Sequence, residues 1–324
     1  SGAHGAAASP RKLSIDARPG IGEAVAIALA LCDPEIEVVA ITATAGQVAG
    51  EMATLNLQTI VSLLDPPLWP RFGVANGPAT AVPRDRLTPQ PALLQGETGL
   101  GECSVPVSEF HQRHDSAKLM AELVRNAPNE ITLLTLGPLT NVQLAIDHHP
   151  EFLEQLQNHV CLGGSVGAGG DTTAAAEFNI YANPEAAAVV LAHPTTTLLV
   201  PLDVSHRLML SFDQYQRWGL SPESGLARLL DQMLPFALRA SRQHLGLEGV
   251  RLPEVIALAM VIAPKLFERE AMSVEVELTG QITRGATVFD RRDIHKWQSN
   301  VEVCTDVDVQ GVIDYMTRVI RATA

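Results

Sequence analysis

The stretch SIDARPGIGEAVAIALAL, residues 14–31, predicts a buried strand, a tight turn and a helix in direct succession. Apolar residues within 12–16 indicate the strand, and residues 23–32 carry small and aliphatic side chains on most faces, which indicates a buried helix. The segment IEVVAITAT, residues 36–44, is apolar and β-branched, as is typical of a central parallel strand. The chain therefore begins with a predicted β-α-β unit.

The same alternation continues along the chain. Further strands are expected at residues 68–74, 131–136, 160–163, 197–200, 273–278 and 299–304. Further helices are expected at residues 51–64, 116–127, 141–148, 151–157, 184–192 and 308–321, with a mostly helical region at 211–267. Residues 75–113 are rich in Pro, Gly and polar residues and predict a long loop near the site. The pattern predicts an α/β fold, an open, mostly parallel, Rossmann-like sheet with helices on both faces.

The composition is that of a globular chain with a sizeable core. The 324 residues are 46% hydrophobic and 18% charged, and they contain no internal repeat, low-complexity tract or clear linker. We therefore expect one domain over residues 12–324. Residues 1–11 lack the apolar core of a signal peptide and are expected to be disordered.

Charge and cysteine usage narrow the function classes. The net charge of −13 disfavours nucleic acid or an anionic membrane as a partner, and no stretch reaches the roughly 18 apolar residues of a membrane span. The four cysteines lie far apart and form no CxxC pair, which favours buried thiols in a reducing compartment over disulfides. We therefore expect a cytoplasmic protein.

Candidate site residues follow from the predicted sheet. Ligands bind beyond the carboxyl ends of the strands in such folds, so the loops at these ends are the place to look. His206, in one of these loops, is interpreted as structural. The polar residues of these loops are Asp16, Glu23, Gln47, Gln95, Asn141, Asp171, Glu177, Asn179, Asp203 and His206.

Several longer segments resemble one enzyme family. They include PEIEVVAITATAGQ at 34–47, GETGLGE at 96–102, TLGPLTNVQLAI at 135–146 and, most specifically, AEFNIYANPEAA at 176–187. On these segments the chain resembles the nucleoside hydrolases, which cleave the N-glycosidic bond of ribonucleosides to give ribose and free base. The resemblance implies the nucleoside hydrolase fold, a nucleoside or other ribosyl ligand, a calcium ion and a homodimer or homotetramer.

The opening motif of that family is an acidic turn of the form DxDPGxDD, which here reads DARPGIGE at residues 16–23. By this resemblance Asp16 keeps the first acid. Arg18 replaces the second acid, which in the family binds calcium and serves as the base for the attacking water. Gly22 replaces an acid that contacts the sugar, and Glu23 replaces an acid that binds calcium.

Further positions depart from the family pattern. Arg251 and Leu252 stand where the family has a His and a calcium-binding Asp before a helix. Gln47 stands in place of an Asn, and Gln95 in place of a His. A backbone carbonyl that binds calcium in the family would fall at Leu136.

The segment that holds ribose in the family is better kept. Glu177, Phe178 and Asn179 match it, and Asp171 stands where an Asn is usual. Asp16 and Glu23 are the candidate catalytic residues. The resemblance implies ligand-binding roles for Arg18, Gln47, Gln95, Asp171, Glu177, Phe178 and Asn179.

The altered turn bears directly on calcium. Calcium takes about 6 to 8 oxygen ligands, several of them carboxylates. The motifs lose two carboxylates and gain a guanidinium, which repels a second cation at short range. We therefore predict no metal and no cofactor. We hypothesise instead that Arg18 lies in or near the calcium position and pairs with Asp16 and Glu23.

Several of these residues also have structural interpretations. Asp16 at a strand end could cap the following turn, and Glu23 is favoured by the dipole of its own helix. Glu177 and Asn179 could make structural hydrogen bonds. The glycine-rich run at 163–170 matches no phosphate-binding motif and is interpreted as a turn.

Three functions are compatible with these observations. The first, ranked highest, is a pseudoenzyme of the nucleoside hydrolase fold that lacks calcium-dependent activity and keeps a ribosyl-type pocket. The second is an N-ribohydrolase with a rearranged, metal-free site, in which Asp16, Glu23 or Asp171 serves as the base and Arg18 binds an anionic group of the substrate. The third is a non-catalytic oligomeric scaffold.

Overall fold

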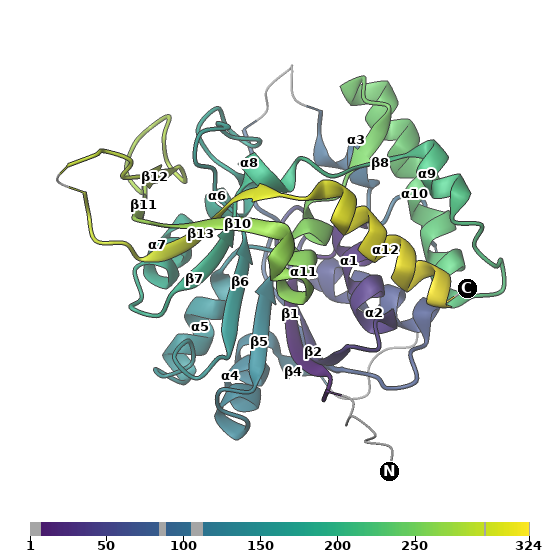
Figure 1. The fold of residues 1–324 in the computed structure, drawn as a ribbon, viewed down its shortest axis with the longest axis horizontal. Coiled ribbons are helices and arrows are strands. Elements are labelled where there is room, and N and C mark those ends of the chain that lie inside the picture. Colours follow the sequence, from purple (N-terminus) through teal and green to yellow (C-terminus); the bar gives the residue numbers. More distant parts are fainter. Residues whose placement is uncertain (1–7, 84–88, 105–112, 295, 324) are drawn as a thin grey trace, which may run out of the picture.

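A nine-stranded sheet forms the centre of the computed structural model, which describes residues 8–83, 89–104, 113–294 and 296–323 (Figure 1). The strand order is β10-β13-β7-β6-β5-β1-β2-β3-β4, and only the β10–β13 pair is antiparallel. The predicted open, mostly parallel sheet is therefore confirmed. The strands are β1 (Arg11–Ala17), β2 (Ile36–Ala43), β3 (Arg71–Val74), β4 (His114–Asp115), β5 (Ile131–Thr135), β6 (Asn158–Leu162), β7 (Thr197–Val200), β10 (Phe267–Met272) and β13 (Val301–Val307).

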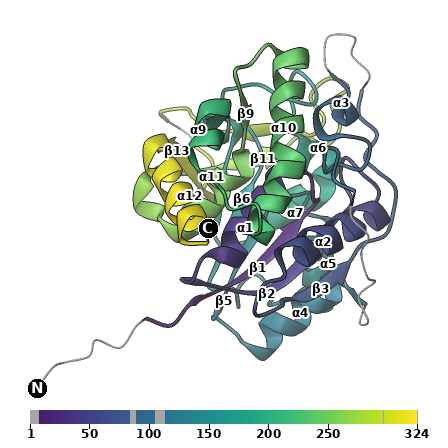
Figure 2. The ribbon, with the colours of Figure 1, turned by 90° about the vertical axis from the view of Figure 1, so that its right-hand side faces the viewer.

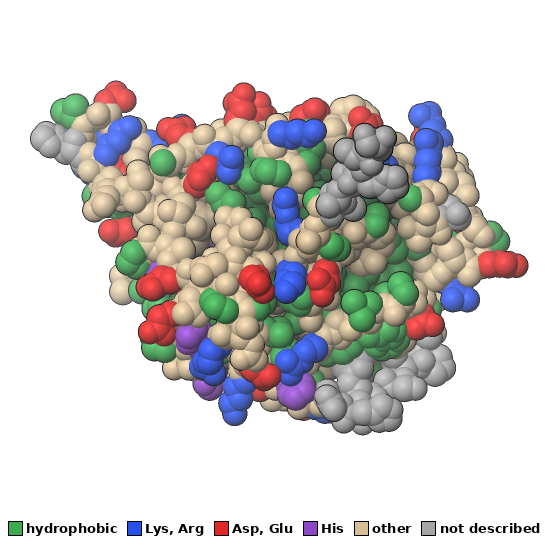
Figure 3. Space-filling model, turned by 60° about the horizontal axis from the view of Figure 1, so that its bottom comes forward, with side chains coloured by type: hydrophobic (Ala, Val, Ile, Leu, Met, Phe, Trp, Pro, Cys, Tyr) green, Lys and Arg blue, Asp and Glu red, His purple; other side chains and the backbone are tan. Residues whose placement is uncertain are grey.

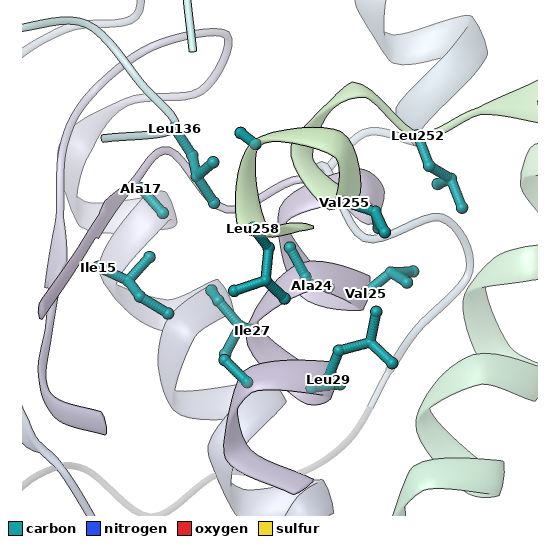
Figure 4. Close-up of a cluster of buried hydrophobic side chains, with 14 of the residues drawn as sticks. Ile15, Ala17, Ala24, Val25, Ile27, Leu29, Leu136, Leu252, Val255 and Leu258 are labelled. Atoms are coloured by element: carbon teal, nitrogen blue, oxygen red, sulfur yellow. The ribbon is translucent and has the colours of Figure 1, made fainter. Parts of the chain in front are cut away.

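Helices cover both faces of this sheet. Successive strand residues point to opposite faces, and Leu133 and Leu134 accordingly belong to two different apolar clusters. One cluster includes α4 (Ser116–Asn126), α5 (Thr140–His148) and α7 (Pro184–Leu191). The other, part of which Figure 4 shows around Leu136, Ala24 and Leu258, includes α1 (Ile21–Cys32), α2 (Gly50–Leu64), α10 (Gly225–Leu245), α11 (Pro253–Ile262) and α12 (Val309–Thr323).

Shorter elements complete the chain. Two antiparallel pairs, β8 (Met209–Ser211) with β9 (Gly249–Arg251) and β11 (Val274–Val276) with β12 (Thr287–Phe289), lie outside the large sheet. The second pair projects to one side of the molecule (Figure 1). The short helix α3 (Pro91–Gln95) packs against α10, as the turned view of Figure 2 shows. The remaining short helices are α6 (Phe178–Ala182), α8 (Leu202–Ser205), α9 (Phe212–Arg217) and the 3₁₀ helix η1 (Pro264–Leu266).

Most predicted elements are present, and the differences have local causes. The predicted helix at 151–157 is wrong: this segment forms turns, in which the Gln157 amide donates to the Ile131 carbonyl and ties the chain to β5. The region 211–267 contains β9, and the predicted loop 75–113 contains α3. Arg11, expected in the disordered segment, already begins β1. Residues 1–7, 84–88 and 105–112 of the expected disordered segment and loop lie outside the described residues.

The described helices include no membrane span, and the face drawn in Figure 3 is not strongly charged. No helix among the described residues is long and apolar enough to cross a membrane. On the face that Figure 3 shows, acidic and basic side chains are interspersed with apolar ones. The acidic excess is therefore not gathered into one patch on that face.

The order of the strands in the sheet indicates where a ligand site is expected. From β1 the chain proceeds through β2, β3 and β4 to one edge of the sheet, whereas β5, β6 and β7 build the other half. Strands β1 and β5 are neighbours, so the crossover connections diverge between them. Such a switch point leaves a crevice at the carboxyl ends of the strands, where Asp16 of β1 lies beside Thr42 of β2 and Thr135 of β5.

Candidate functional site

A cavity of about 370 Å³ lies at this end of the sheet. The turn after β1 contributes Arg18 and Gly22, and α3 contributes Gln95. The loop before α6 contributes Asp171, and the first turn of α11 contributes Glu254. A volume of this size is in the range of about 300–1,000 Å³ found for small-molecule sites, so the cavity can enclose a ligand.

Asp16 lies beneath the cavity and does not line it. Its side chain is fully buried, and its Oδ1 accepts hydrogen bonds from Thr42 Oγ1 at 2.6 Å and Asn141 Nδ2 at 2.9 Å. Its Oδ2 has no hydrogen-bond partner. Burial raises the pKa of Asp16 to about 7, although the two hydrogen bonds act in the opposite direction.

Arg18 points into the protein rather than to solvent. Its Nε donates to Oδ1 of Asn179 at 2.9 Å and lies 3.6 Å from Oε1 of Glu23. Its Cζ lies 4.5 Å from the centre of the Phe178 ring, within the range of cation–π attraction. The hypothesised pairing with Glu23 is present, whereas that with Asp16 is not, because Asp16 is held by Thr42 and Asn141.

The stem of Arg18 needs the glycine at residue 46. A Cβ atom added there would lie 2.5 Å from Cδ and 2.9 Å from Cβ of Arg18. These separations are shorter than any ordinary carbon contact. Gly46 therefore leaves the space through which the arginine side chain reaches the interior.

Glu23 closes the first turn of α1. Its Oε2 accepts a hydrogen bond from the Gly20 amide at 3.2 Å, the half of a capping box that the N3 acid supplies, while Oε1 faces Arg18. Burial raises the pKa of Glu23, and attraction to Arg18 acts in the opposite direction. Glu23 therefore has a structural contact at the start of its helix and also an ionic contact with Arg18.

Glu254 belongs to this cluster and is absent from the sequence-based set. It lies in the first turn of α11, is 6% exposed, and has an Oε2 atom without a hydrogen-bond partner. Burial, followed by repulsion from Glu23, raises its pKa to about 8, while Arg18 lowers it. A sequence signal for Glu254 is its position two residues after Leu252, which stands where the family has a calcium-binding Asp.

Glu177 and Asn179 use their polar atoms inside the protein. Glu177 caps α6, accepting from the Asn179 amide at 2.9 Å and from the Gly164 and Ile180 amides at 3.0 and 3.1 Å. Asn179 Nδ2 donates to the Leu136 and Leu162 carbonyls at 3.0 and 2.9 Å. Burial, with Asp171 nearby, raises the pKa of Glu177 to about 7. Neither residue lines the cavity, so both position its wall.

The other residues expected to bind the ligand do line the cavity, whereas Asn141 and Asp203 of the candidate loops do not. Gln95 Oε1 accepts from the Ile21 amide at 3.0 Å, and Asp171 Oδ1 accepts from the Phe178 amide at 2.9 Å. Gln47 and the Phe178 ring complete this set.

Two basic residues without an expected ligand-binding role also line the cavity. They are His206, which was interpreted as structural, and Arg251. Burial, followed by repulsion from Arg251, lowers the pKa of His206. Both effects favour the neutral imidazole, whereas the nearby Asp171 favours the charged form.

The side chains present do not suit calcium. The guanidinium of Arg18 lies among the acids, and the Leu136 carbonyl already accepts from Asn179. Within the described part of the chain, no three His, Cys, Asp or Glu side chains are arranged to hold a metal ion. The positive charge in this cluster comes from Arg18, which offsets both Glu23 and Glu254.

The comparisons with known proteins identify the family. The profile described as inosine-uridine preferring nucleoside hydrolase matches residues 13–314. The chain belongs to this family. The pyrimidine-specific ribonucleoside hydrolase RihA of Escherichia coli O7:K1 (strain IAI39 / ExPEC) is 33% identical over 306 residues, covering 93% of this chain and 96% of the relative.

Solved structures agree with this assignment to the nucleoside hydrolase family. The plant nucleoside hydrolase PpNRh1 superposes with a TM-score of 0.84 at 26% identity, covering 97% of this chain and 99% of that one. A purine-preferring ribonucleoside hydrolase from Gardnerella vaginalis gives the same TM-score, identity and coverage. The nucleoside hydrolase fold is therefore confirmed, and the family indicates N-glycosidase chemistry.

Proposed function

We propose that this member of the nucleoside hydrolase family binds a ribosyl-type ligand in its cavity and lacks calcium-dependent hydrolase activity. The observation that carries the proposal is the position of Arg18, whose guanidinium lies between Asn179, Glu23 and the Phe178 ring. A permanent cation among these acids serves the electrostatic purpose of a bound ion. It also repels any calcium ion that approaches the same acids.

The cavity wall supports a ligand with several hydroxyl groups. Gln47, Gln95 and Asp171 supply amide and carboxylate groups, and Phe178 supplies an aromatic face. Each hydroxyl group of a ribose can both donate and accept a hydrogen bond, so it can pair with either kind of group. A purely structural scaffold has no need of such a cavity.

Metal-free hydrolysis is the second candidate, favoured by the carboxyl groups of Asp171 and Glu254 at the cavity wall. In this reaction a water oxygen bonds to the anomeric carbon, and the bond from that carbon to the base nitrogen breaks. One carboxylate takes a proton from the water, and the base leaves with the bonding electron pair and accepts a proton from the carboxyl group so formed or from solvent water. Asp16 and Glu23, the original catalytic candidates, lie beneath the wall and suit this role less well.

The deciding experiment combines binding with turnover. Calorimetric titration of ribose and of purine and pyrimidine nucleosides is run with excess calcium and, separately, with chelator, and reducing sugar is assayed in parallel. Binding that is equal in both conditions, without sugar release, supports the proposal. Sugar release that resists the chelator supports the metal-free reaction, whereas calcium-dependent release overturns both.

Three further properties that the sequence led us to expect are also part of the proposal. We infer one domain over residues 12–324, a cytoplasmic location and assembly as a homodimer or homotetramer. The four cysteines are free thiols, which supports a reducing compartment. Light scattering on the purified protein tests the assembly, and a monomer over a wide concentration range would contradict it.

A further inference from the structure

Gly22 and Glu254 fit together at the cavity wall. A Cβ atom added at residue 22 would lie 2.0 Å from Oε2 and 2.9 Å from Oε1 of Glu254. The space that a side chain at 22 would take is thus filled by a carboxyl group from α11. Both residues line the cavity.

The fold leaves one oxygen of the Glu254 carboxyl group without a hydrogen-bond partner. Glu23 and Glu177 accept hydrogen bonds from backbone amides at the starts of α1 and α6. Oε2 of Glu254 and Oε1 of Glu23 are both buried without a hydrogen-bond partner, but Oε1 of Glu23 faces Nε of Arg18 at 3.6 Å, and of the two residues only Glu254 lines the cavity. Burying an unpaired polar atom is costly, so its retention beside a cavity points to a partner that arrives with the ligand.

We propose that Glu254, admitted by Gly22, is the carboxyl group through which this cavity binds a hydroxyl group of its ligand. This inference rests on the proposed function, because it names a contact for the proposed ribosyl ligand. The neighbouring groups suit the same ligand: Asp171 and Gln95 line the wall beside Glu254, and the Phe178 ring offers a flat apolar face. A ring with several hydroxyl groups pairs with this combination of carboxyl, amide and aromatic groups.

The position of Arg18 explains why Glu254 is tolerated there. The arginine attracts the Glu254 carboxyl group and offsets the repulsion from Glu23. Arg18, from the β1–α1 turn, thus pairs with Glu23 of α1 at 3.6 Å and also attracts the Glu254 carboxyl group of α11. The result is a carboxyl group fixed in place before the ligand binds, which reduces the entropy lost on binding.

The test is a cycle of protein variants and ligand variants. Glu254→Gln keeps the shape of the side chain, and Gly22→Ala pushes the carboxyl group out of its place. The exposed Glu275→Gln on β11 is the matched control. Each protein is titrated calorimetrically with the tightest-binding nucleoside and with its 2′-, 3′- and 5′-deoxy analogues, after thermal unfolding has shown that it folds.

We expect Glu254→Gln and Gly22→Ala to weaken nucleoside binding about tenfold, as the loss of one buried hydrogen bond predicts. One deoxy analogue should bind wild type more weakly, and the same deletion should cost Glu254→Gln nothing further. Equal weakening toward every analogue would assign Glu254 a structural role and overturn the inference. Unchanged binding to Glu254→Gln would overturn it alone, whereas no binding to wild type would overturn the proposed function with it.

Discussion

Nε of Arg18 donates a hydrogen bond to Oδ1 of Asn179 across 2.9 Å, although 161 positions separate the two residues in the chain. This contact joins the turn after β1 to α6, two segments on neighbouring parts of the site. Asn179 is itself held by the Leu136 and Leu162 carbonyls, which follow or end β5 and β6. Arg18 is therefore fixed from a second side as well as by Glu23.

Removing the buried cation should destabilise the protein. Arg18→Ala leaves Glu23 and Glu254 buried without their positive neighbour, and breaking a buried ion pair on one side costs roughly 3–5 kcal/mol. Urea unfolding of wild type and variant measures the loss. The control is Arg242→Ala, whose ion pair with Glu248 is exposed and should be worth about 0–1 kcal/mol. Equal losses for the two variants would contradict a buried role for Arg18.

Returning an acid to residue 18 should create a response to calcium. Arg18→Asp puts a carboxylate in the place of the cation that interacts with Glu23 and Glu254, each of which has a buried oxygen without a hydrogen-bond partner. Calcium should then raise the unfolding temperature of the variant, with a stabilisation of about 2.7 kcal/mol at 100 times the dissociation constant. Arg18→Ala is the control and should not respond. Stabilisation of wild type by calcium would refute the proposed replacement of the ion by Arg18.

Stability should depend on pH through Glu254. Its pKa rises from 4.5 to about 8 on folding, so the folded state binds more protons than the unfolded state between these values. The contribution of Glu254 is therefore complete below about pH 4.5 and is lost as the pH rises toward about 8. Glu254→Gln removes this dependence. The unfolding free energies of wild type and Glu254→Gln should converge or cross as the pH rises from about 4.5 to about 8. A difference between them that does not change with pH would argue against a buried Glu254.

The hydrogen bonds of Asp16 give a separate prediction on stability. Asn141 Nδ2 donates both to Asp16 Oδ1 and to the Ala43 carbonyl, each at 2.9 Å. Asn141→Ala should cost about 1–3 kcal/mol, because it leaves buried acceptors unpaired. Chemical unfolding provides the measurement, with Gln310→Ala as the control, since Gln310 bonds Asp314 on the exposed face of α12. A cost below that of the control would show that water replaces the lost amide.

The fold could be predicted because its signals are local. The apolar run of β2 and the buried faces of α1 mark their elements from short stretches of sequence, and strand alternation then defines the sheet. The segment 151–157 shows the limit of such signals. There Gln157 binds the backbone of β5, and that distant contact decides between helix and turn.

The site could be predicted only in part, for a related reason. Arg18, Gln47, Gln95, Asp171 and Phe178 were named because they lie in motifs, and all of them line the cavity. Glu254, which lines it too, was not named, because its place depends on Gly22, 232 positions earlier in the chain, and no pattern within α11 reveals that pairing. Solvent exposure could not be predicted either, so Asp16 and Glu23 were ranked as catalytic although they lie beneath the wall.

The close approach of Gly46 to Arg18 makes the two positions depend on each other. A Cβ atom at residue 46 would lie 2.5 Å from Cδ and 2.9 Å from Cβ of Arg18, so a side chain there and the present course of the arginine exclude each other. Gly22 and Glu254 form a second such pair, in which the contact falls on the flexible end of the glutamate side chain. The tolerance of the site to mutation is therefore a property of pairs: a larger residue at either glycine requires a change in its partner.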